Sequence, residues 1–284
     1  MKKVLIVGKG SYIGESIKNW LDRFKSDYYV EIVSSLNKEW KNTDFSQFET
    51  VIDLAGIAHI NNITEDMRDL FYSVNRDLTI EIGTHAKENG VKHFIYFSSM
   101  NVYGDNCHYI QDREKVGPTS FYGDSKLQGD LGLEKLEDNT FSVAHVRPPF
   151  VYGKGCRGNY KSISKIAQKT PIFPTFRNRK SMIYIDNLCE FIRLLVNDGA
   201  CGVFTPQNKE LISTADLVAE VSKVQGHKIW FTSLFNWLIK PLIKVNSNIR
   251  RAFDDDCYSQ EISNHYDNSY CVVNFEDSII KTEL

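Results

Sequence analysis

Three residues of this chain form a pattern that can move a proton on and off an oxygen atom. Tyr122 and Lys126 are four residues apart at the start of a predicted helix, so their side chains share one helix face. A tyrosine hydroxyl has an ordinary pKa of about 10, and a neighbouring ammonium group is expected to lower that pKa. Ser99 follows a separate predicted strand, and its hydroxyl can hold the oxygen that Tyr122 protonates. The three residues predict proton transfer at a carbinol or ketone, coupled to hydride transfer by a cofactor.

The start of the chain predicts a place for such a cofactor. An apolar run over residues 4–7 is typical of a buried parallel strand, and a helical pattern follows over residues 15–24. The glycine-rich turn between them predicts a phosphate site, because backbone amides at a helix N-terminus face an anion. An ordinary tight turn is the alternative. The expected cofactor contacts here are Gly8, Gly10, Ser11, Tyr12, Ile13 and Gly14.

The second predicted strand, residues 29–33, bears on the choice of dinucleotide. In folds that prefer NAD, an acidic residue at the end of this strand binds the ribose hydroxyls. Here Ser34 and Ser35 follow the strand, and no carboxylate stands at that point. Because two serines with Lys9 and Lys38 nearby suit a 2′-phosphate, we expect NADP(H), with NAD(H) as the alternative.

Strands and helices continue to alternate, which predicts an α/β fold with a Rossmann-type doubly wound parallel sheet. Further strands are expected at residues 50–54, 93–97 and 141–147, and helices at residues 66–89 and 122–136. Ligands of such sheets bind at the carboxyl ends of the strands, where Ser99 lies. Further expected cofactor contacts at this edge and on the helices are Leu54, Ala55, Gly56, Asn75, Tyr122, Lys126 and Pro149.

The regular pattern loosens after Gly153 into loops rich in Gly, Arg and Lys that alternate with short helices. We therefore expect a dinucleotide-binding domain over residues 1–153 and a smaller substrate-binding part over residues 154–284. Residues 181–205 are expected to return to the first domain.

Composition excludes several other classes of protein. The chain has 284 residues, of which 42% are hydrophobic and 25% charged, as in ordinary globular proteins. A net charge of −2 argues against a general nucleic-acid binder. The six cysteines are scattered without a C-x-x-C pair, so we expect reduced thiols in a cytoplasmic protein and no metal site.

No stretch is long and apolar enough to predict a transmembrane segment, and the first apolar run is too short for a signal peptide. The most apolar stretch is residues 229–245, which Lys240 and Pro241 interrupt. We expect a helix packed in the C-terminal part; the alternative is a surface that touches a membrane or a partner enzyme.

In this order, the motifs resemble the extended short-chain dehydrogenase/reductases that act on nucleotide sugars, the NAD-dependent epimerase/dehydratase family. The resemblance spans essentially the whole chain. It rests on residues 8–14, 54–56, 74–75, 90–94, 98–104, 122–126, 147–153 and 181–188. Residues 147–149, 158–160 and 249–282 are similar to bacterial capsule and O-antigen enzymes.

This resemblance implies NADPH-dependent reduction of the C4 ketone of a UDP-4-keto-6-deoxy-N-acetylhexosamine, in the synthesis of surface polysaccharide precursors. Ser99, Tyr122 and Lys126 are then the catalytic residues. Two positions depart from the family: Ser11 stands where the turn usually has its middle glycine, and Lys180 replaces an arginine that grips the diphosphate. A lysine supplies the charge but not the bidentate fork.

The substrate contacts expected on this basis are Ser99, Asn101, Arg147, Asn159, Arg179, Lys180 and Arg250. For the basic residues among them, a solvated surface loop is the alternative. The resemblance also implies a homodimer through helices 66–89 and 122–136, although their periodicity fits an internal core equally well.

Two other functions fit the same motifs. A UDP-sugar 4-epimerase of the UDP-glucose/UDP-galactose type would use the same three residues and keep NAD tightly bound. A non-catalytic dinucleotide sensor is the alternative from another class, but such proteins usually lose the tyrosine or the lysine. A 4,6-dehydratase is disfavoured because Met100 and Asn101 stand where its acid/base pair would be.

Overall fold

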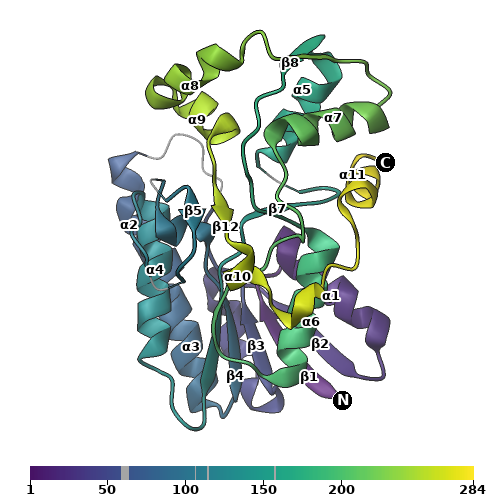
Figure 1. Ribbon diagram of the computed structural model, residues 1–284. Coiled ribbons are helices and arrows are strands. Elements are labelled where there is room, and N and C mark those ends of the chain that lie inside the picture. The colour runs from purple at the N-terminus through teal and green to yellow at the C-terminus, as the bar shows by residue number, and fades with distance from the viewer. Residues whose placement is uncertain (59–63, 106, 114, 157) are drawn as a thin grey trace.

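The computed structural model describes residues 1–58, 64–105, 107–113, 115–156 and 158–284. At its centre lies a six-stranded parallel sheet in the order β10-β6-β4-β3-β1-β2 (Figure 1). Its strands are β1 (Lys2–Val7), β2 (Tyr28–Val33), β3 (Thr50–Asp53), β4 (His93–Phe97), β6 (Ser142–Val146) and β10 (Gly202–Phe204). The predicted fold class, an α/β protein with a doubly wound parallel sheet, is confirmed.

Helices cover both faces of this sheet, because alternate side chains of a strand point to opposite faces. Val4 and Ile6 of β1 join one apolar core, which includes residues of α1 (Tyr12–Leu21) and α6 (Ile185–Asp198). Leu5 and Val7 join the other core, which α3 (Thr79–Glu88) and α4 (Phe121–Glu134) cover. The inner strands are therefore buried on both sides, which explains their continuous apolar runs.

The helical segment expected at residues 66–89 is not one regular α-helix. It consists of a short 3₁₀ turn, α2 (Arg68–Tyr72), a π-helical turn (Ser73–Leu78) and α3. Such π turns insert a residue into the helix and are frequent at functional sites. Here the turn carries the buried Asn75.

The remaining elements form a smaller part above the carboxyl edge of the sheet (Figure 1). Its helices are α5 (Tyr160–Lys169), α7 (Thr214–Val224), α8 (Asn236–Val245), α9 (Ser247–Phe253), α10 (Gln260–Ser263) and α11 (Phe275–Glu283). Short parallel pairs join β5 (Tyr109–Ile110) to β12 (Cys257–Tyr258), β7 (Phe150–Tyr152) to β9 (Met182–Tyr184), and β8 (Ile172–Pro174) to β11 (Trp230–Thr232). Between them the chain returns to the sheet, where α6 packs beside α1 and β10 pairs with β6.

The stretch at residues 229–245 corrects our expectation of a packed helix. It forms β11 and then α8, and within α8 only Ile239 is buried. Trp237 on the same helix is 72% exposed.

Among the described residues, no helix has both the length and the apolar character needed to cross a membrane. The six cysteines are free thiols.

Candidate active site

The two turns expected to hold the dinucleotide lie against each other. β1 pairs with β2 on one side and with β3 on the other, so the direction of strand order changes between β1 and β3. Open α/β sheets bind ligands at the carboxyl edge of such a switch point. A Cβ added to Gly8, which follows β1, would lie 2.8 Å from the Cβ of Leu54, which follows β3. Glycine at position 8 thus permits this close approach.

The glycine turn fits a pyrophosphate at the start of α1, even though Ser11 replaces the middle glycine. Ser11 has φ −74°, which suits an L-residue, and its Oγ accepts a hydrogen bond of 3.3 Å from the Gly14 amide as the helix N-cap. Gly10 instead has the left-handed conformation, with φ +81°. A Cβ on Gly14 would lie 3.0 Å from the Gly8 oxygen, so the turn is tight. The Gly10 and Ser11 amides already donate, to Glu15 Oε1 and to the Gly8 carbonyl, so the amides at the first positions of α1 are the ones that remain for an anion. Tyr12 and Ile13 begin the helix.

The end of β2 offers partners to both kinds of dinucleotide. Ser34 Oγ accepts a hydrogen bond from the Leu36 amide. Ser35 and Lys38 line a hollow of about 570 Å³ together with the carboxylates of Asp77 and Glu81. Glu81 lies 4.0 Å from the Lys38 ammonium and therefore offsets part of its charge. A 2′-phosphate would find Ser35 and Lys38 here, whereas ribose hydroxyls would find the two carboxylates.

Asn75, in the π-helical turn, links two segments of the site through hydrogen bonds. Its Oδ1 accepts a hydrogen bond of 2.8 Å from the Ile57 amide, and its Nδ2 donates to Ser125 Oγ at 3.1 Å. A Cβ on Gly56 would lie 3.0 Å from Asn75 Oδ1 and 2.9 Å from Lys126 Nζ. The Asn75 amide, expected to contact the cofactor, is thus engaged with the loop after β3 and with α4. Ala55 and Pro149 are buried at the ends of β3 and β6.

Ser99 and Tyr122 meet at the carboxyl edge of β4. Ser99 caps the 3₁₀ turn Met100–Tyr103, and its Oγ accepts a hydrogen bond of 3.2 Å from the Asn101 amide. Burial raises the pKa of Tyr122 above its ordinary value, and a hydrogen bond with the Ser99 side chain offsets part of that rise. Our expectation that Lys126 lowers this pKa is not met in this structure. At neutral pH, Tyr122 is a neutral phenol.

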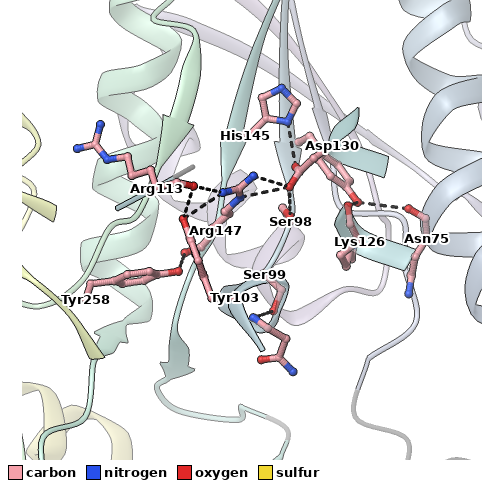
Figure 2. Close-up of polar contacts among 12 residues, drawn as sticks. Asn75, Ser98, Ser99, Tyr103, Arg113, Lys126, Asp130, His145, Arg147 and Tyr258 are labelled. Atoms are coloured by element: carbon pink, nitrogen blue, oxygen red, sulfur yellow. Dashed lines mark hydrogen bonds and ion pairs between the residues drawn. The ribbon is translucent and has the colours of Figure 1, made fainter. Parts of the chain in front are cut away.

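Lys126, one helical turn after Tyr122 on α4, is buried (Figure 2). Its Nζ donates a hydrogen bond of 2.9 Å to the Phe97 carbonyl and lies 4.9 Å from the centroid of the Tyr96 ring. Burial lowers the pKa of Lys126 to about 8, although the charges of Asp53 and Asp130 act in the opposite direction. Lys126 therefore remains a cation at neutral pH.

Arg147 belongs to a buried network, which corrects its expected role in substrate binding. Its Nη2 donates to Asp130 Oδ2 at 3.0 Å, and its Nη1 donates to the Tyr103 hydroxyl at 3.0 Å (Figure 2). Asp130 also accepts hydrogen bonds from Ser98 at 2.9 Å and, through its other oxygen, contacts His145 Nδ1 at 2.9 Å. Arg147 is 3% exposed, so its guanidinium holds the strand ends together instead of facing a ligand.

The other candidate substrate residues lie above the carboxyl edge of the sheet. The basic residues among them have acidic neighbours. Arg179 donates to Asp255 Oδ2 at 2.6 Å. Burial lowers the pKa of Lys180, and the charges of Asp256, Asp254 and Asp255 oppose that shift. Asn101 and Asn159 are exposed. Arg250 of α9 lies 3.9 Å from Asp105, two residues after the turn Met100–Tyr103.

Comparisons with known proteins agree with this geometry. Residues 28–203 match the model of the NAD dependent epimerase/dehydratase family. The chain is 30% identical over 246 residues to the N-acetyl-alpha-D-glucosaminyl-diphospho-ditrans,octacis-undecaprenol 4-epimerase of Escherichia coli O157:H7, covering 80% of this chain and 73% of that protein. It belongs to the NAD-dependent epimerase/dehydratase family. The predicted family and the prediction of an enzyme are thereby confirmed.

Two further proteins are similar to this family member. It is 27% identical over 266 residues to a UDP-glucose 4-epimerase of Vibrio cholerae, which covers 84% of this chain and 80% of that protein. The solved structure of UDP-N-acetylglucosamine 4-epimerase from Bacillus cereus has a TM-score of 0.75 at 13% identity, covering 100% of this chain and 96% of that one. At this identity the structural likeness shows the fold alone.

Two buried carboxylates of this epimerase/dehydratase family member were missed in the sequence. Asp130 follows Lys126 by four residues on α4, a spacing that the sequence does show. Asp53 ends β3, and its Oδ1 accepts a hydrogen bond of 2.9 Å from the Ala55 amide. Burial raises the pKa of Asp53 to about 6, although the charge of Lys126 opposes the shift. Both carboxylates compensate the buried ammonium group.

Proposed function

We propose that the protein epimerises C4 of a sugar that is joined to a diphosphate, with a nicotinamide dinucleotide as cofactor. The observation that carries this proposal is the meeting of Ser99 and Tyr122 beside the buried Lys126 at the switch-point edge of the sheet. Both curated relatives described above are 4-epimerases. The name of one relative gives a sugar linked to UDP, and the name of the other gives a sugar linked through a diphosphate to a polyprenol. Both names therefore describe a sugar diphosphate.

In this proposal the chain's own residues handle the proton at the C4 oxygen. The bound dinucleotide would supply the hydride chemistry by accepting a hydride from C4 and returning it. Because the raised pKa of Tyr122 keeps its side chain a phenol, the phenol must first lose its proton to solvent; the phenolate would then take the proton from the C4 hydroxyl and the phenol so formed would return it, while Ser99 holds the same oxygen. Lys126 keeps a positive charge at the end of β4. Arg250, together with Arg179 and Lys180, would receive the diphosphate.

NADPH-dependent reduction of a UDP-4-keto-6-deoxy-N-acetylhexosamine is the second candidate, and two observations favour it. The raised pKa of Tyr122 suits a residue that only donates a proton. In addition, β2 is followed by Ser34 and Ser35 with no carboxylate at that point. Such a reductase would serve the synthesis of surface polysaccharide in the cytoplasm.

One set of assays separates these functions. The purified protein is incubated with UDP-N-acetylglucosamine or UDP-glucose, with NAD⁺ and no reductant, and the C4 configuration is followed by NMR. Interconversion of the two epimers supports the epimerase. Consumption of NADPH by a UDP-4-keto-6-deoxy-N-acetylhexosamine, without interconversion in the first assay, supports the reductase. The first assay is repeated with a polyprenyl-diphospho-N-acetylglucosamine dispersed in detergent. Dinucleotide binding without any of these reactions would overturn both functions and leave a sensor.

We also infer that the outer surfaces of the helical segments at residues 66–89 and 122–136 form a homodimer interface. Leu131 of α4 is 41% exposed and lines a hollow of about 450 Å³ with Ile80 and Gly132. Sedimentation equilibrium of the wild type beside Leu131→Arg tests this; a wild type that stays monomeric would overturn it.

A further inference from the structure

The smaller part of the molecule exposes an unusual concentration of large apolar side chains. Of the seventeen such side chains exposed among the described residues, seven lie within residues 230–245. Trp237 is 72% exposed and Val245 80%. The seven are Trp230, Leu234, Phe235, Trp237, Leu238, Leu242 and Val245. Patches of this kind on a folded protein mark sites of interaction.

Helix α8 turns its apolar face outward. Ile239 is its buried residue, whereas Trp237, Pro241 and Val245 recur every four residues on the opposite side and are exposed. Lys240 and Lys244 are exposed along one flank of that side. An amphipathic helix that belongs to a globular core buries its apolar stripe, so this orientation is the reverse of the usual one.

The surface is held in this orientation by packing beneath it. β11, which carries Trp230, pairs with β8. The Phe173 ring lies 6.1 Å from that of Phe231 and 5.8 Å from that of Phe253, between centroids, so β8, β11 and α9 share one aromatic cluster. α8 and α9 lie at the end of the molecule farthest from the chain's N-terminus (Figure 1). The exposed side chains therefore belong to a built surface.

The segment that carries the exposed apolar side chains is also strongly basic. Residues 221–253 contain six basic residues and no Asp or Glu, whereas the whole chain has a net charge of −2. The rest of the chain therefore carries −8, the difference between −2 and +6. The basic residues are Lys223, Lys228, Lys240, Lys244, Arg250 and Arg251. The surface is complementary to a partner that is apolar in its interior and anionic at its face.

We propose that residues 228–251, the docking surface, bind an anionic lipid bilayer. Tryptophan is enriched at membrane interfaces because its ring is apolar and its N–H is polar, and Trp230 and Trp237 hold that position here. The apolar side of α8 enters the boundary between headgroups and acyl chains, with the helix in the plane of the membrane. Lys240 and Lys244 then lie among the anionic headgroups.

Docking in this way defines the class of substrate, and this step rests on the proposed function. The docking surface continues into α9, whose Arg250 lies 3.9 Å from Asp105, two residues beyond the turn Met100–Tyr103 that Ser99 caps. The catalytic edge and the lipid-facing surface therefore adjoin. A sugar diphosphate anchored in the membrane by a polyprenol can enter the site from that side, so we assign the lipid-linked sugar diphosphate as substrate.

Vesicle binding tests the docking surface without any substrate. The protein is floated with vesicles of phosphatidylcholine, with or without about 30% phosphatidylglycerol. We expect binding that depends on the anionic lipid, that weakens in about 0.5 M NaCl, and that shifts tryptophan emission to the blue. Because Trp20 and Trp40 are buried, that shift reports on the docking surface.

Two paired variants make the test specific. Lys240→Glu/Lys244→Glu is expected to lower the vesicle partition coefficient roughly tenfold or more, since each cation near the membrane contributes. Lys25→Glu/Lys92→Glu changes the same number of charges at exposed positions just before β2 and β4, on the far edge of the sheet, and should leave partition unchanged. Trp237→Ser/Leu242→Ser should lose binding and the emission shift.

Several outcomes would overturn the proposal. They are absence of vesicle binding, equal loss in both charge-reversed variants, or self-association that Trp237→Ser/Leu242→Ser abolishes, which would assign the surface to a second copy. Epimerisation is measured separately, with UDP-N-acetylglucosamine and with a polyprenyl-diphospho-N-acetylglucosamine dispersed in detergent. If both reactions fail while vesicles bind, the proposed function is wrong and the docking surface stands. If only the UDP-sugar reacts, the assignment of a lipid-linked substrate is wrong. If either sugar is epimerised while vesicles do not bind, the proposed function stands and the docking surface is wrong.

Discussion

The ammonium group of Lys126 donates a hydrogen bond of 2.9 Å to the backbone carbonyl of Phe97. Phe97 is the last residue of β4, so this bond ties α4 to the strand end from which Ser99 extends. Holding a cation in a buried place is unfavourable, and burial accordingly lowers the pKa of Lys126 to about 8. The lysine is thus held at the strand end where the chemistry needs a charge, with the carboxylates of Asp53 and Asp130 offsetting part of the cost of its burial.

Tyr122→Phe removes the proposed proton carrier and keeps the ring. We expect kcat to fall about 10²–10⁴-fold, because general acid–base catalysis has that magnitude. Affinity for the dinucleotide, followed by fluorescence titration, should stay within about twofold. Tyr29→Phe removes a hydroxyl from an exposed ring on β2 and serves as the control. A Tyr122→Phe enzyme with wild-type turnover would remove Tyr122 from the mechanism.

Lys126→Met should change how stability depends on pH. The pKa of Lys126 is about 8 in the folded protein, against an ordinary 10.5. Between these values the unfolded chain binds the proton and the folded chain does not, so stability rises with pH. One pKa unit is 1.36 kcal/mol, so the rise amounts to about 3 kcal/mol. In urea titrations at pH 8 and 10, the wild type should gain stability relative to Lys126→Met. Parallel curves would contradict the shift.

Arg147→Met tests whether this residue braces the fold or binds substrate. Removing one partner of a buried ion pair leaves the other charge uncompensated, so we expect a loss of about 3–5 kcal/mol in urea unfolding. The double variant Asp130→Asn/Arg147→Met should recover part of that loss, because neither charge then remains. KM of the folded fraction should be unchanged. A tenfold higher KM with unchanged stability would return Arg147 to the substrate site.

The parts of the fold that follow from local pattern could be predicted from the sequence. β1 and β4 are apolar runs buried on both faces, and the turn at Gly8–Gly14 follows β1 directly. Tyr122 and Lys126 share a helix face because of their spacing alone. The choice of partner for each charged group could not be predicted in this way, since it depends on contacts between distant segments. Arg147 meets Asp130, and Arg179 meets Asp255, 76 residues further along the chain.

The orientation of residues 229–245 also could not be predicted from local sequence pattern. Their apolar character suggested a packed helix, since hydrophobicity alone does not say which way a helical face points. Only the positions of β8, β11 and Ile239 decide that Trp237 faces outward. The absence of acidic residues around this stretch was the available sign of an anionic partner.

Gly123→Ala should impair catalysis through geometry. A Cβ at this position would lie 2.4 Å from the Asn101 carbonyl oxygen, so α4 must shift away from the turn that carries Ser99. A displacement of about 1 Å at a reacting group can cost roughly 100-fold in rate, and we expect kcat to fall by about 10–100-fold. In Gly117→Ala, the added Cβ would meet nothing closer than the Tyr103 oxygen at 4.0 Å, and activity should be kept. Equal rates in both variants would show that the approach is not needed.

His265 should make the protein sensitive to acid. Its Nε2 accepts a hydrogen bond of 3.1 Å from the Thr205 amide, so the ring is neutral. Burial lowers the pKa of His265 to about 4, and the charge of Arg113 adds to the shift.

In acid the unfolded chain protonates His265 first, because the ordinary histidine pKa is about 6.5. Stability is therefore lost as pH falls from about 6.5 to 4, by roughly 3 kcal/mol, and the loss stops below that range. His265→Asn keeps an acceptor for the Thr205 amide but does not titrate. Comparing urea midpoints of wild type and variant at pH 7 and 5 isolates this contribution, and the wild type should lose more. If both lose equally, other groups cause the acid sensitivity.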